Sequence, residues 1–200
     1  MNATVNKSKD IVQDTKKYIV NTARELFSEF TYLGVSMDDI AKKLNIAKAS
    51  IYYHFTGKVE IYEKVLDEVF DDLKLVIINA SREVEIDKRM HKLIKNYLDF
   101  GFREKNLIKS MVIKLSPADA QITNHIAGLR NQISNLIQPI IEDFIKSKDL
   151  ENRADSHLLA SMLTSMMDGL LLDYSFLNKK MNPEKVANQI VVILFSNLAN

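Results

Sequence analysis

Glycine and proline are scarce in this chain, and their scarcity is what most constrains its fold. Only 5 glycines and 3 prolines occur among 200 residues. Sandwiches and barrels need a turn roughly every ten residues, and turns rely on these two residue types. Apolar residues instead recur at helical spacing, as at Ile19, Ala23, Leu26, Phe27 and Phe30. The sequence therefore predicts an all-α fold of about nine helices, with no strand.

The predicted helices form a short group near the N-terminus and a longer group after it. In the first group we expect helices from about Val12 to Phe30, from Ser36 to Leu44 and from Ala47 to about Gly57. A linker helix begins at Lys58, and the remaining helices are expected over residues 58–81, 87–102, 104–114, 117–148, 154–177 and 183–198. This pattern predicts a three-helix head over residues 11–57 and a helical-bundle body over residues 58–200.

Local signals mark where several of these helices begin, end or break. Ser36 followed by Asp39 resembles a capping box with a shortened acid. Gly34 is expected to end the first helix as a C-terminal glycine. Asn45 is expected to take the left-handed conformation that a tight turn between two helices demands. Pro139 lies inside a helical pattern, and we expect it to kink or split that helix.

Composition and charge exclude several classes of protein. The chain has no cysteine, which excludes a disulfide scaffold and a thiolate metal site. Residues 1–58 hold nine Lys and Arg against six Asp and Glu, although the whole chain carries a formal net charge of only +1. A modestly basic head is compatible with nucleic-acid binding. No segment resembles a membrane span or a signal peptide, so the expected location is cytoplasmic.

No motif predicts catalysis, a cofactor or a metal site. The sequence contains no nucleophile elbow, phosphate-binding loop, dinucleotide fingerprint or zinc motif. His91, His125 and His157 have no companions at metal-ligand spacing. Adjacent acids such as Asp38 and Asp39 point about 100° apart on a helix, so they cannot share a proton. We expect a protein that is not an enzyme and that needs neither cofactor nor metal.

The informative stretch lies between Val35 and Lys58. It predicts a helix, a tight turn and a second helix, the arrangement in which the second helix enters a DNA major groove. Ala47, Ile51 and Phe55 are spaced by four and are expected to face the core. The other side chains of the second helix are expected to face outward and contact DNA: Lys48, Ala49, Ser50, Tyr52, Tyr53 and His54.

Each candidate contact has a physical reason. Lys48 has the reach for a guanine edge or a phosphate, and the Ala49 methyl suits a thymine methyl. Phosphate contacts need hydrogen-bond donors or positive charge. We expect them from the side chains of Ser50, Tyr52, Tyr53, His54 and Lys58 and from the main-chain N–H groups of Ser36 and Met37.

Two motifs in this stretch resemble the DNA-binding domain of the TetR family of transcriptional regulators. They are Y-Y-H-F-x-x-K at residues 52–58 and D-D-I-A-K-K-L-N-I at residues 38–46. The resemblance covers about residues 11–70, and M-M-D-G-L-L-L-D-Y at residues 166–174 is similar to the family's penultimate helix. The chain departs at Asn45, where the family often has glycine, and at Ala47, where it often has a Ser or Thr cap.

The resemblance implies a homodimer that packs through its last two helices and binds a pseudo-palindromic operator. It also implies an apolar pocket in the body for a small-molecule effector. Large or mobile side chains and those with a polar tip are the candidates to line that pocket. They are Tyr97, Phe100, Met111, His125, Met166, Met167 and Tyr174. Asp168 and Asp173 are acids that could pair with a cationic ligand, and each could equally be a charge at the rim of the pocket.

The function expected from the sequence is a dimeric, sequence-specific DNA-binding transcriptional regulator. We expect a repressor that a small apolar or amphipathic ligand releases. Two alternatives stay open at this point. One is a helical small-molecule carrier or enzyme without specific DNA binding. The other is a DNA-binding regulator that a protein partner controls.

Overall fold

A computed structural model describes residues 2–112, 120–151, 154–177 and 180–193 of the chain. Side chains are described over the same ranges except at residues 2–13 and 109–112. Within these ranges the chain forms nine α-helices and no strand. The all-α prediction is therefore confirmed. None of the helices in the described ranges has both the length and the apolar character that crossing a bilayer requires.

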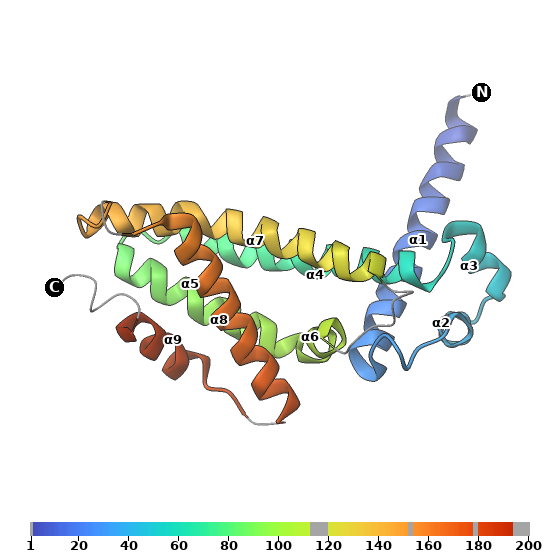
Figure 1. The fold of residues 1–200 in the computed structure, drawn as a ribbon. Helices are drawn as coiled ribbons and strands as arrows, with labels where there is room; N and C mark the ends of the chain where they lie inside the picture. The colour runs from blue at the N-terminus through green and yellow to red at the C-terminus, as the bar shows by residue number, and fades with distance from the viewer. Residues whose placement is uncertain (1, 113–119, 152–153, 178–179, 194–200) are drawn as a thin grey trace.

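Three helices form the head at one end of the molecule, and a fourth leads away from it (Figure 1). They are α1 (Asn2–Phe30), α2 (Met37–Leu44), α3 (Lys48–His54) and α4 (Lys58–Ser81). The predicted bounds of α4 are confirmed. The first helix starts earlier than expected, and α3 ends before Thr56 and Gly57 because Phe55 already has extended backbone angles.

Five helices follow in the body, as predicted. They are α5 (Ile86–Arg103), α6 (Lys105–Val112), α7 (Ala120–Ser147), α8 (Ser156–Phe176) and α9 (Pro183–Val191). The expected helix starting at Pro117 and the expected end of the last helix lie outside the described residues. Of the two expected effects of Pro139, a kink or a split, the split does not occur, because α7 runs through this residue. Pro139 is exposed, so water can reach the carbonyl whose helical hydrogen bond the ring removes.

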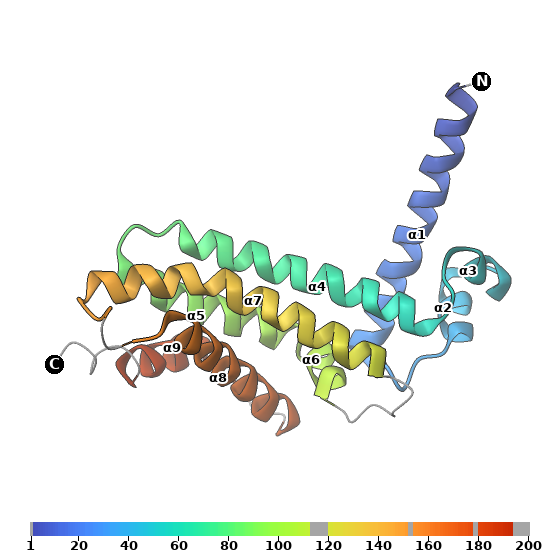
Figure 2. The same cartoon turned by 45° about the horizontal axis from the view of Figure 1, so that its top comes forward.

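The body helices form a long bundle beside the head. Helices α4 and α7 run side by side in both views, and α9 packs on α5 (Figures 1 and 2). Hydrogen bonds reinforce the contact between α4 and α7. Gln121 donates to the Glu63 carboxylate at 2.9 Å, and His125 Nε2 lies 2.8 Å from Asp67 Oδ1. Helix α4 is therefore fixed along the body over most of its length.

A polar connection ties α1 of the head to the body. One guanidinium nitrogen of Arg24 lies 2.9 Å from Asp72 on α4 and 2.9 Å from Glu104, which precedes α6. Asn106 on α6 donates its side-chain amide to the main-chain oxygen of Ser28 on α1. The two carboxylates hold the pKa of Arg24 above its ordinary value although burial opposes this. Charge-assisted bonds of this kind set how the head sits on the body.

The predicted role of Gly34 as the C-terminal glycine of α1 is wrong. Thr31 takes the left-handed position after the helix, with φ of 64°, and no glycine in the described residues has a positive φ. Glycine is needed at residue 34 for a different reason. A Cβ atom there would collide with the main-chain oxygen of Phe30, so the loop can return past α1 only without a side chain.

Candidate nucleic-acid interface

Helix α2 begins with the predicted capping box, which the structure confirms. Ser36 Oγ accepts a hydrogen bond from the Asp39 main-chain N–H at 3.2 Å, and the Ser36 N–H donates to Asp39 Oδ2 at 2.8 Å. The hydroxyl and N–H groups of Ser36 lower the pKa of the Asp39 carboxyl. Because the Ser36 N–H is occupied in this way, the structure disfavours the expected phosphate contact from it. The side chain of Met37 is buried, while its main chain opens the helix.

The turn between α2 and α3 rests on Asn45, as predicted. Asn45 has φ of 54° and ψ of 43°, the left-handed conformation. Its N–H donates to the Lys42 carbonyl, and the next N–H, at Ile46, donates to the Ala41 carbonyl, both at 3.1 Å. Asparagine tolerates this conformation better than most non-glycine residues. The turn therefore keeps its geometry although the chain lacks the glycine that the family often has here.

Helix α3 is anchored from one side. Ile51 is fully buried and Phe55 is 4% exposed, as predicted. The prediction that Ala47 also faces the core is wrong. Ala47 is exposed and lies before the helix with extended backbone angles, so the four-residue spacing does not apply to it. Ala47 also provides no side-chain hydrogen bond to cap α3.

The opposite side of α3 is open to solvent. Tyr53 is 77% exposed and Tyr52 is 49% exposed, values that are high for large aromatic side chains. Lys48, Ala49 and Ser50 are also exposed. We call this set the α3 face: Lys48, Ala49, Ser50, Tyr52 and Tyr53. It presents one ammonium and three hydroxyls, which can donate hydrogen bonds to bases and phosphates, and a methyl group that suits a thymine methyl.

His54 lies at the margin of the α3 face. Its ring is half-buried and packs edge-on against Tyr53, with ring centroids 5.0 Å apart. Its Nδ1 atom is buried and has no hydrogen-bond partner among the residues that the structure describes. His54 therefore supports the orientation of Tyr53 as well as standing beside the predicted contact surface.

Lys58 has a different environment from the one expected of a phosphate contact. Its ammonium donates to the main-chain oxygens of Tyr32 and Val35, each at 3.0 Å. The same ammonium lies 4.1 Å from the centroid of the Tyr32 ring, a cation–π contact. These partners belong to the loop between α1 and α2. Lys58 thus holds the start of α4 against the head, with two of the three N–H donors of its ammonium directed at loop carbonyls.

An aromatic cluster supports this arrangement, and sequence reasoning missed it. Tyr62 on α4 is fully buried, and its ring centroid lies 5.0 Å from that of Phe27 and 4.7 Å from that of Tyr32. The apolar spacing of α4 could have predicted that Tyr62 is buried, because Tyr62 is adjacent to Ile61 on the side of the helix that faces the core. The cluster makes the first turns of α4 part of the head's core.

The loop from α3 to α4 is also ordered by a missed residue. Glu60 accepts hydrogen bonds from the Thr56 main-chain N–H at 2.6 Å and from the Thr56 hydroxyl at 2.8 Å. These bonds lower the pKa of Glu60. A Thr followed four residues later by Glu at a helix start was the available signal. The loop geometry fixes where α3 ends relative to α4.

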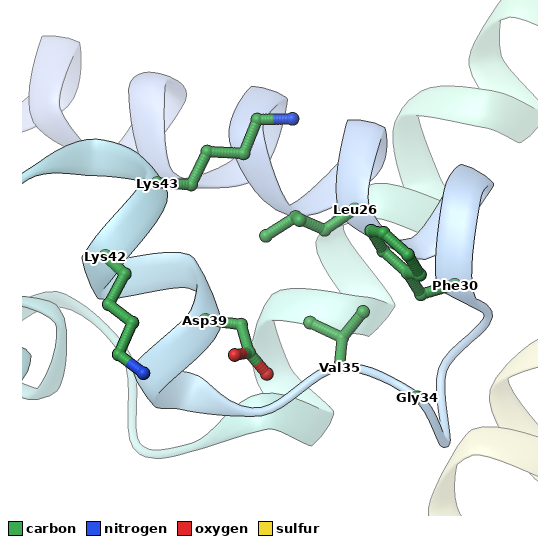
Figure 3. A pocket seen from close by; sticks show the side chains of 7 residues that line it. All are labelled: Leu26, Phe30, Gly34, Val35, Asp39, Lys42 and Lys43. Atoms are coloured by element: carbon green, nitrogen blue, oxygen red, sulfur yellow. The ribbon is translucent and has the colours of Figure 1, made fainter.

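The described part of the head has at least three hollows on its surface. One of about 400 Å³ lies between the end of α2 and the start of α3, and a second of about 410 Å³ is lined by the loop before α2 together with Tyr52 and Lys58. Asp38 and Lys48 line both. The third, of about 490 Å³, has Leu26, Phe30 and Val35 on one side and α2 lysines on the other (Figure 3). No residue of α3 lines the third hollow, so it is separate from the α3 face.

The predicted ligand-contact residues of the body do not converge on one cavity. Met166 and Tyr174 line a hollow of about 560 Å³ between α8 and α9. Met167 and Phe100 are buried in the core. His125 instead pairs with Asp67 and lines a separate hollow between α4 and α7. The side chain of Met111 lies outside the described residues.

Tyr97 belongs to a polar network in the body. Its hydroxyl donates to Asp168 Oδ1 at 2.6 Å, and Arg130 lies 2.8 Å from Asp168 Oδ2. Burial raises the pKa of both Tyr97 and Asp168, against the opposing effect of Arg130. Asp168 is therefore already paired, so the idea that it receives a cationic ligand is not supported. Within the described ranges, no cluster of three or more His, Asp or Glu residues is placed to hold a metal ion.

The fold and the α3 face define a helix-turn-helix regulator of transcription. Residues 19–65 match the sequence model of the bacterial regulatory proteins of the tetR family. The chain is 33% identical over 135 residues to IcaR of Staphylococcus aureus, the HTH-type negative transcriptional regulator of the biofilm operon icaADBC. The match spans 67% of this chain and 69% of IcaR. The chain therefore belongs to the TetR family.

Solved structures share the fold over nearly the whole chain. FadR from Bacillus subtilis, solved in complex with stearoyl-CoA, has a TM-score of 0.75 at 17% identity and covers 90% of this chain and 97% of its own. The TetR family regulator PfmR from Thermus thermophilus has a TM-score of 0.67 at 22% identity, with 88% and 96% covered. At these identities the likeness establishes the fold.

Proposed function

We propose that this regulator is a homodimeric repressor in which the α3 face reads DNA and a ligand in the body controls release. In this proposal residues 11–57 form the DNA-binding unit, and residues 58–200 form the unit for dimerisation and ligand binding. Two α3 helices related by a two-fold axis would read a pseudo-palindrome whose half-sites lie about one helical turn apart or slightly more. Negative regulation is supported by the likeness to IcaR.

The observation that carries the DNA-binding part is the two-sided character of α3. Ile51 and Phe55 are buried while Tyr52 and Tyr53 are exposed. Exposing two tyrosines beside a lysine has no benefit for the stability of the head, because their aromatic surface stays in water. The proposed contacts are the α3 face, His54 and the main chain of Met37. Ser36 and Lys58 act from within the head by fixing the start of α2 and of α4.

The exposed apolar residues of helix α8 support the proposal that the protein is a dimer. Apart from His157 in the first turn, the exposed positions of α8 follow a stripe at helical spacing: Leu158, Met162, Ser165, Gly169, Asp173 and Phe176. Three of these six are large apolar residues, and Leu158 and Phe176 are each more than half exposed. The small residues between them allow close approach of another helix. In the described part of α9, by contrast, Lys185, Asn188 and Gln189 are exposed, so we place α8 at the centre of the interface.

The hollow between α8 and α9 supports an amphipathic effector. Its apolar lining includes Met166, Leu170 and Ile190, and Lys180 and Lys185 lie at the same hollow. An acyl chain would contact the apolar side chains, and an anionic group would pair with a lysine. FadR, which shares the fold, was solved with stearoyl-CoA. We therefore propose an effector that carries an acyl chain and a negative charge.

The DNA-binding proposal predicts a specific loss in the Lys48→Ala variant. Binding to a duplex that the wild-type protein selects from a randomised library should weaken by about 1–3 kcal/mol, because a base or phosphate contact is lost. Fluorescence anisotropy across a salt titration measures this loss. Lys88→Ala on α5 removes an equal charge from the body and should bind like wild type. Equal binding by both variants would contradict the proposed surface.

The dimer proposal predicts that Met162→Lys separates the subunits. A lysine in the middle of the α8 stripe would bury a charge against the partner helix, which is costly. Sedimentation velocity should show a dimer for the wild type and a monomer for this variant. Leu75→Lys provides the matched control, because Leu75 on α4 is also an exposed apolar residue, at 59% against 47% for Met162. A wild-type monomer, or a dimer that survives Met162→Lys, would contradict the interface.

The effector proposal predicts that stearoyl-CoA releases the protein from the selected duplex, whereas coenzyme A alone does not. Leu170→Trp should fill the hollow and prevent release while leaving DNA affinity unchanged, because no residue of the head lines this hollow. Anisotropy of labelled DNA under increasing acyl-CoA measures both. Release from the Leu170→Trp variant at the wild-type concentration would show that the ligand binds elsewhere.

A further inference from the structure

An ion pair connects the two helices of the helix-turn-helix at the edge of the α3 face. Lys48, the first residue of α3, places its Nζ atom 2.7 Å from Oδ2 of Asp38 in the first turn of α2. Both side chains are exposed. The pair lies between the two head hollows of about 400 and 410 Å³, since Asp38 and Lys48 line both of them. An acidic side chain therefore stands within the surface proposed to meet DNA.

Asp38 is not needed for the local structure of α2. The capping box is made by Ser36 with Asp39, and Asp39 also provides a negative charge in the first turn. An exposed ion pair contributes little to stability, because water screens it and ordering two side chains costs entropy. Asp38 therefore acts through Lys48, by changing how the Lys48 ammonium meets DNA.

The geometry leaves Lys48 able to bind DNA while it stays paired. An ammonium has three N–H donors, and Asp38 takes one of them. Two donors remain, which is the number that the O6 and N7 acceptors of guanine require. Pairing with Asp38 also removes rotational freedom from a long side chain, so less entropy is lost when the ammonium meets a base.

The charge of Asp38 acts in the opposite direction on binding that uses phosphates alone. A carboxylate beside the ammonium cancels most of its field at a distance and itself repels phosphate oxygens. Non-specific DNA binding depends almost entirely on such phosphate contacts. Asp38 thus favours the contact of Lys48 with base edges and opposes DNA binding in which Lys48 contacts phosphates alone.

We propose that Asp38 is a specificity-determining positioning residue, which holds the Lys48 ammonium toward base edges and penalises binding through phosphates alone. The proposal rests on the proposed DNA-binding function of the α3 face. The ligand in this proposal is double-stranded DNA, and the site is the Asp38–Lys48 pair between the two head hollows.

The test compares the selected duplex with a scrambled duplex of the same base composition. In the Asp38→Asn variant, affinity for the scrambled duplex should rise about fivefold at moderate salt, and its log–log salt slope should steepen by about one. Affinity for the selected duplex should change by less than about twofold, because lost positioning offsets the removed repulsion. Discrimination between the duplexes therefore falls. Asp38→Glu keeps the charge and should restore the low affinity for the scrambled duplex.

Two controls separate this role from a general charge effect. Glu25→Gln breaks a comparable exposed pair of the head, with Lys43 at 2.9 Å, and should leave discrimination unchanged. In a Lys48→Ala background, Asp38→Asn should raise both affinities by the same factor, because no ammonium remains to be positioned. Thermal melting of each variant checks that the head stays folded.

Three outcomes would overturn the inference. If Asp38→Asn raises both affinities equally in the presence of Lys48, Asp38 is only a surface charge. If Glu25→Gln reproduces the loss of discrimination, the effect belongs to net charge. Either result leaves the proposed function intact. A wild-type protein that fails to discriminate between the duplexes would overturn both the function and this inference.

Discussion

Burial of Ile51 and Phe55 is the constraint on which the rest of the site depends. Helix α3 has only seven residues, too few to be stable without tertiary packing. Removing these two side chains from water holds the helix in the head and fixes its rotation. Once the rotation of the helix is fixed, the helical repeat directs Tyr52 and Tyr53 outward. The surface that we propose to read DNA is thus a consequence of how the opposite side of α3 is packed.

The position of α3 is passed on to the body through the start of α4. Tyr62 shares an aromatic cluster with Phe27 and Tyr32, and Lys58 bonds to the loop before α2. Any shift of α4 must therefore move the head with it. Arg24 adds a second connection from α1 to Asp72 and Glu104. The proposed ligand, if it moves body helices, would have two physical routes to the position of α3.

Sequence reasoning succeeded where a local rule decides the structure. Helical periodicity located α4, the left-handed preference of asparagine located the turn at Asn45, and spacing identified Ile51 as buried. It failed where contacts between distant segments decide. The pairing of Lys58 with loop carbonyls and of Lys48 with Asp38 depends on how helices pack, which periodicity does not encode. The predicted ligand-pocket residues do not lie around one cavity for the same reason. Large side chains in a helical body mostly fill its core.

The most direct test of the account is oxidative footprinting of the tyrosines by mass spectrometry, with and without the selected duplex. Tyr18 on α1 is 68% exposed and serves as an internal reference, since its exposure is close to that of Tyr53 at 77%. We expect DNA to protect Tyr52 and Tyr53 strongly from oxidation and to leave Tyr18 reactive. Protection of Tyr18 with unchanged oxidation of Tyr52 and Tyr53 would contradict this expectation.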